Sequence, residues 1–126
     1  MSIQSNFSGS IQLTDPNTGT VQLYKALAAL YTGTISTVAE SLAIGTATSV
    51  IALPISPTQL VYVKNLHATN TVIATWTPNG GSSAVVCTLQ PGSMILMNEA
   101  NATSGITAFS LSASGASTPV DYVLVG

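Results

Sequence analysis

Residues 71–98 read TVIATWTPNGGSSAVVCTLQPGSMILMN, and this stretch decides the fold class. Short runs rich in Val, Ile and Thr are separated by turn residues, which is typical of β-strands. Pro78-Asn79-Gly80-Gly81 is a hairpin signal between two such runs. Gln90-Pro91-Gly92 places proline and glycine side by side, as a type II turn requires. The stretch therefore predicts three strands, at 71–77, 84–89 and 93–98.

The same pattern extends to both sides of this stretch. It predicts five more strands, at 34–39, 47–53, 59–65, 106–112 and 119–125. Alternation within the strands supports the prediction, because Val72, Ala74 and Trp76 share one face of their strand. Eight short strands with regular turn spacing favour a mainly β fold, a jelly-roll-like antiparallel β-sandwich.

The N-terminal residues 1–33 have a different pattern. Ile3, Phe7, Ile11 and Leu13 alternate loosely. Over 21–31 the apolar residues follow a helical spacing, and the alanines there raise helix propensity. The sequence therefore predicts an N-terminal arm, residues 1–33, with one short helix. The β-sandwich would occupy 34–126 within a single compact domain, and the arm could pack on a neighbouring subunit.

Charge is scarce throughout the chain. Only six of 126 residues are charged, two cations and four acids, and the net charge is −2. None lies between Asn65 and Asn98. An ordinary domain has roughly a quarter of its residues charged. A surface of this kind does little to repel another copy of itself, and its strand edges have few protecting charges besides Lys64 and Asp121. We therefore predict a homo-oligomer, with a trimer favoured.

The same scarcity excludes several function classes. Phosphate binding needs clustered Lys and Arg, so we expect no nucleic-acid partner. A polybasic membrane anchor is excluded for the same reason, and no apolar run is long enough for a membrane helix. The N-terminus has no cationic and apolar leader pattern. We expect synthesis in a cytoplasm without export.

Residues that could carry chemistry are few. His67 and Cys87 are the sole histidine and cysteine, on different predicted elements. A Cys87–His67 pair is the one candidate for nucleophilic catalysis, whereas a loop histidine with local hydrogen bonds and a small buried cysteine is the favoured interpretation. Glu99 and Asp121 are the best pair for glycosidase chemistry, but nothing in their spacing requires them to meet. We predict no catalytic, metal or cofactor site, and no enzyme.

An aromatic platform for sugar stacking is an alternative. Trp76 could form one with Tyr62 or Tyr122. A lone tryptophan at an alternating strand position is more often a core residue. The carbohydrate-binding β-sandwich therefore stays as the second interpretation.

Several segments resemble small virion proteins of tailed bacteriophages. An extended strand ends in Lys-Asn-Leu at 60–66 and is followed by a polar loop and a strand at 69–72. A Leu-x-Pro-Gly turn at 89–92 and a strongly apolar strand at 94–97 come next, and the chain ends on Tyr122-Val123-Leu124-Val125.

The resemblance covers about residues 59–125. It implies a non-enzymatic, jelly-roll-like head decoration (cement) protein of the virion, or a related tail or fibre component that serves adhesion. Such a protein acts by contact with the major capsid protein or other virion proteins, and it has no catalytic residues to transfer.

Overall fold

The computed structural model describes residues 3–33, 37–54, 56–81, 83–98 and 105–126. The chain divides into two compact units, Met1–Ile35 and Ser36–Gly126. Ten strands form the regular structure of the described residues. None of these residues belongs to a helix long and apolar enough to cross a membrane.

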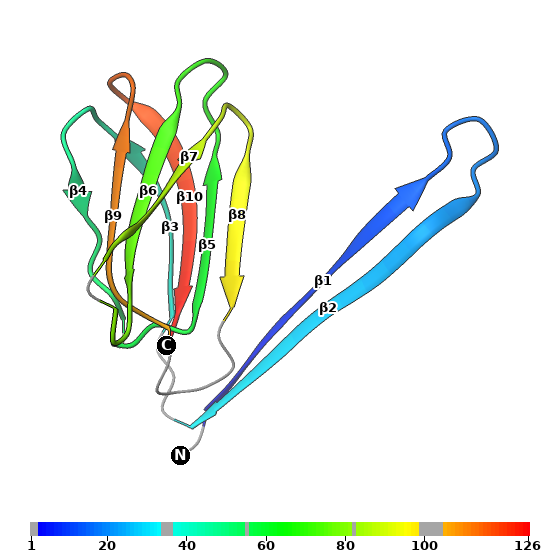
Figure 1. Ribbon diagram of the computed structural model, residues 1–126, viewed down its shortest axis with the longest axis horizontal. Coiled ribbons are helices and arrows are strands. Elements are labelled where there is room, and N and C mark those ends of the chain that lie inside the picture. Colours follow the sequence, from blue (N-terminus) through cyan, green and yellow to red (C-terminus); the bar gives the residue numbers. More distant parts are fainter. Residues whose placement is uncertain (1–2, 34–36, 55, 82, 99–104) are drawn as a thin grey trace. The chain divides into compact units, whose positions relative to one another are not determined.

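The second unit is a sandwich of two four-stranded sheets, which face each other in Figure 1. One sheet has the order β3-β10-β5-β8 and the other β4-β9-β6-β7, and all neighbouring strands are antiparallel. The strands are β3 (Thr37–Ile44), β4 (Ser49–Val50), β5 (Leu60–Asn65), β6 (Val72–Pro78), β7 (Val85–Leu89), β8 (Met94–Asn98), β9 (Ile106–Ala113) and β10 (Thr118–Val125).

The strand order follows from folding one long antiparallel ribbon. The first sandwich strand pairs with the last, β3 with β10, and the successive inner pairs are β4 with β9, β5 with β8 and β6 with β7. The ribbon then rolls up, because β10 also pairs with β5 and β9 with β6. This is the strand order of a jelly roll, so the predicted mainly β, jelly-roll-like sandwich is confirmed.

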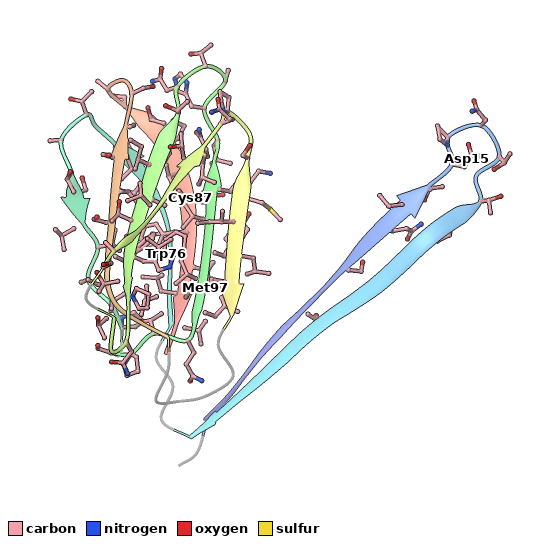
Figure 2. All side chains as sticks on the ribbon, viewed as in Figure 1. Asp15, Trp76, Cys87 and Met97 are labelled. Atoms are coloured by element: carbon pink, nitrogen blue, oxygen red, sulfur yellow. The ribbon has the colours of Figure 1, made fainter. Side chains whose placement is uncertain are left out.

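The core lies between the two sheets and is built by alternation along the strands. In β10, Val120, Tyr122 and Leu124 are buried and the residues between them are half-buried. Phe109 and Leu111 contribute from β9 of the opposite sheet. Trp76, Cys87 and Met97 pack against this core, as the labelled side chains in Figure 2 show. Trp76 packs on the core as predicted, whereas Cys87, which was predicted to be buried, is half-buried.

The first unit is a two-stranded antiparallel hairpin of β1 (Ile3–Thr14) and β2 (Val21–Gly33). Its loop is closed by the Asp15 carboxylate, which accepts a hydrogen bond from the Asn17 amide at 2.8 Å. That bond, together with one from Thr18, holds the pKa of Asp15 below its usual value. Gly19 has a φ of 72°, a backbone conformation that favours glycine.

The helix predicted over 21–31 is wrong, because β2 occupies these residues. Leu23, Leu27 and Tyr31 are four residues apart, and this spacing fits a strand as well as a helix. Pairing with β1 along the whole strand replaces the helix that the alanines favour, since intrinsic propensity is weak against such contacts.

A buried amide ties the two sheets together. The Asn65 side chain, at the end of β5, is fully buried. Its Nδ2 donates to the carbonyl oxygens of Asn70 at 2.8 Å and of Leu89 and Gln90 at 3.2 Å each. Its Oδ1 accepts the amide of His67 at 3.0 Å. Because Leu89 ends β7 in the other sheet, this one side chain joins the sheets and shapes the loop between β5 and β6.

We expect Asn65→Leu to lower the free energy of unfolding by about 2–4 kcal/mol, because it leaves buried carbonyl groups without a donor. Denaturant unfolding of the full chain measures the change. Gln90→Leu is the matched control, since the Gln90 side chain is exposed, and it should change stability by less than about 0.5 kcal/mol. Equal losses for both variants would contradict the role of the buried amide.

Candidate functional site

A shallow cavity lies on the sheet that contains β3, β10 and β5. Its volume is about 320 Å³. The lining residues are Glu40, Ser41, Tyr62, Asp121, Tyr122 and Val123. Two of the four acidic residues of the chain therefore line one cavity, Glu40 opposite Tyr122 and Asp121 opposite Ser41 in the register of β3 and β10.

Both carboxylates in this cavity already have partners. The Ser41 hydroxyl donates to Asp121 Oδ1, and the Tyr122 hydroxyl donates to Glu40 Oε2 at 2.9 Å. Burial of the phenol, reinforced by the bond to Glu40 and by its negative charge, raises the pKa of Tyr122 above its usual value. Among the described residues, no group of three or more His, Cys, Asp or Glu side chains could hold a metal ion. The cavity thus offers hydroxyl and carboxylate oxygens beside an aromatic ring.

The second surface is the outer side of the other sheet, which we call the uncharged face. Along β9, β6 and β7, residues alternate between the core side and the outer side of the sheet. The core-side residues of β9 and β6 are buried or half-buried, whereas Val85 at the start of β7 is 41 % exposed. Val50 is 83 % exposed and Val86 63 %, and Ser110 and Thr75 lie between them in the register of the sheet. Ile73, 38 % exposed, is two residues from Thr75 on the same side of β6. The uncharged face consists of Val50, Ile73, Thr75, Thr77, Val86, Thr88, Ala108, Ser110 and Ser112.

Lys64 and Asp121 do not protect strand edges, contrary to the sequence-based prediction. Lys64 lies on β5 and Asp121 on β10, and both strands have a neighbour on each side. The two residues stand opposite each other in the register of these interior strands. The edge strands of the sandwich are β3, β8, β4 and β7, and among them only β3 has a charged residue, Glu40. Strand position in the sheet is a long-range property, which the local sequence does not reveal.

The structure does not join His67 and Cys87 into a site. His67 lies in the loop after β5, and its Nδ1 accepts the backbone amides of Thr69 at 3.0 Å and Asn70 at 2.8 Å. The predicted local hydrogen bonds of this histidine are confirmed. Cys87 packs on the core from β7, and no hydrogen bond between it and His67 occurs in the described part of the chain.

Trp76 and Tyr62 are also separated. Trp76 packs on the core from β6, whereas Tyr62 lines the shallow cavity on the other sheet, so the two rings do not form one platform. Glu99 lies outside the described residues. The meeting of Glu40 with Tyr122, and of Ser41 with Asp121, was not predicted, because it depends on the pairing of β3 with β10. Nothing in the local sequence indicates that pairing.

Comparisons with known proteins give no relative from which a role could be transferred. No protein-family model, no curated protein and no solved structure matches the chain.

The raised pKa of Tyr122 predicts a loss of stability in alkaline solution. The folded protein favours the neutral phenol of Tyr122. The stabilisation that this phenol contributes is therefore full below the unfolded pKa of about 10, and it is lost as pH rises through the higher folded pKa. Unfolding free energies of the wild type and of Tyr122→Phe should therefore converge as pH rises above about 10. The same pH dependence in both proteins would contradict this assignment.

Proposed function

We propose that this chain is a non-enzymatic structural protein of a bacteriophage virion, which decorates or cements the capsid through contacts between subunits. Its partners would be further copies of itself and the major capsid protein or other virion proteins. The uncharged face is the observation that supports this proposal most. It combines exposed aliphatic side chains with short hydroxyl side chains on one side of a sheet.

The composition of this face determines what kind of contact it can make. Val50 and Val86 expose apolar surface to water, and burial of such surface favours association. Thr and Ser hydroxyls can bond to a neighbour without the cost of desolvating a charge. No ion pair can form from residues of this face, so salt should affect the contact little. A cement protein must hold its position by contacts of this sort.

Retention on particles tests the proposal. In purified particles of the phage that encodes the chain, the protein should remain bound in about 1 M NaCl and leave on mild denaturant treatment. Ile73→Lys should reduce its occupancy at least about tenfold, because the contact would have to desolvate a charge. The bound amount is measured by quantitative mass spectrometry.

Met94→Lys is the matched control, since Met94 is 57 % exposed on β8 of the other sheet. It should stay bound as the wild type does. Absence of the protein from the particles, or its release by NaCl alone, would contradict the proposed function. Wild-type occupancy of Ile73→Lys would instead show that the uncharged face is not the contact.

A second candidate function, carbohydrate binding by an adhesion component of the tail or fibre, is favoured by the shallow cavity. Tyr62 offers a ring beside Ser41 and the carboxylates of Glu40 and Asp121. Sugar binding sites combine an apolar ring surface with oxygen acceptors for the sugar hydroxyls.

A glycan array followed by calorimetry tests this candidate. Tyr62→Ala should weaken any glycan binding at least about tenfold. Trp76→Phe should leave it unchanged, because Trp76 packs on the core. Binding that depends on Trp76 alone, or no binding to any glycan, would exclude the cavity as a sugar site.

A further inference from the structure

The edge strand β7 differs from the other edges of the sandwich. Among the described residues it pairs with β6 alone, at the end of the sheet β4-β9-β6-β7. Val85 is 41 % exposed and Val86 63 %, and Thr88 is exposed as well. An unpaired edge with exposed β-branched residues is a template for a further strand.

The other edges carry features that discourage pairing. At the opposite end of the same sheet, β4 has two residues only, and a very short strand offers little to pair with. In the other sheet β3 contains the exposed Glu40. Strand β8 also lacks charge and proline, but its residues 95–97 are half-buried, whereas Val85, Val86 and Thr88 of β7 are exposed. Strand β7 has neither a charge nor a proline in its five residues.

The sequence of β7 is compatible with pairing to itself. An antiparallel pair of copies centred on Cys87 would place Val86 opposite Thr88 of the second copy and Val85 opposite Leu89. Val85, Cys87 and Leu89 belong to the inward face of β7, and Val86 and Thr88 to the outward face. In this register, inward residues therefore meet inward residues and outward residues meet outward residues. Pairs of β-branched side chains are favourable across strands.

Charge also favours a second copy as the occupant. The charge-free stretch from Asn65 to Asn98 includes β6, β7 and β8, so two copies that meet here bring no like charges together. A partner with a charged strand would gain no ion pair along β7. Another copy of the same edge satisfies the open backbone groups without a charge being desolvated.

We propose that β7 is a self-association edge, at which two copies pair antiparallel about a two-fold axis and join their four-stranded sheets into one. This interface rests on the sandwich alone and does not require that the protein belong to a virion. It gives a dimer, whereas the sequence analysis favoured a trimer, and the mass in solution distinguishes the two.

Lysine substitutions in the full chain test the interface. Analytical ultracentrifugation of the wild type should give a dimer of the 12.8 kDa chain. Val86→Lys should weaken dimerisation at least about tenfold, because charged residues at strand edges oppose pairing. Met94→Lys introduces a lysine at an exposed position on β8 of the other sheet, outside the uncharged face, and should leave the dimer intact. A wild-type monomer, or a Val86→Lys protein that dimerises as well as Met94→Lys, would overturn the proposal.

Cross-linking tests the register independently of any loss of folding. In a Cys87→Ser background, chains with Val86→Cys are mixed with chains carrying Thr88→Cys and oxidised. Disulfide-linked dimers should form faster in this mixture than with either chain alone, since the register places these positions opposite each other. A mixture of Val50→Cys with Thr88→Cys is the control. Equal rates in both mixtures would overturn the proposed pairing, and they would leave the particle-retention test of the proposed function unaffected.

Discussion

Antiparallel backbone pairing is the interaction on which this structure depends. With six charged residues in the chain, ion pairs can contribute little, and backbone hydrogen bonds satisfy most polar groups. The jelly roll extends this pairing from β3 and β10 to β6 and β7 in one folded ribbon. At the open edge strand and on the uncharged face, the chain has few side chains whose charge would oppose contact with other proteins.

The two sheets are held together by apolar packing and one well-placed polar group. Ile44, Phe109 and Leu124 fill the space between the sheets, and their burial supplies the main stabilising term. Asn65 adds directional hydrogen bonds, because its side-chain amide donates to carbonyl groups of the loop and of the opposite sheet. The surfaces considered for function are therefore outward faces of strands whose inward faces form the core.

Local sequence was informative about strands and uninformative about their neighbours. The predicted strand at 59–65 corresponds to β5 (Leu60–Asn65) and that at 93–98 to β8 (Met94–Asn98), because turn residues and alternation are local signals. The helix expected over 21–31 was wrong, because leucines four residues apart lie on one side of an α-helix and also on one face of a β-strand. The interior positions of Lys64 and Asp121, and the cavity between Glu40 and Tyr62, depend on pairing between distant strands. A single sequence does not show that pairing in any visible pattern.

Scarcity of charge connects the composition with the proposed role. A face of aliphatic and hydroxyl side chains, next to an unprotected edge, is suited to contacts that last and that ions do not weaken. We infer that this protein acts while bound to other subunits through such contacts. The most direct measurement is the native mass of the purified chain across a series of NaCl concentrations. We expect an assembly larger than 12.8 kDa whose size does not fall as salt rises. A monomer at all concentrations, or an assembly that salt dissociates, would contradict it.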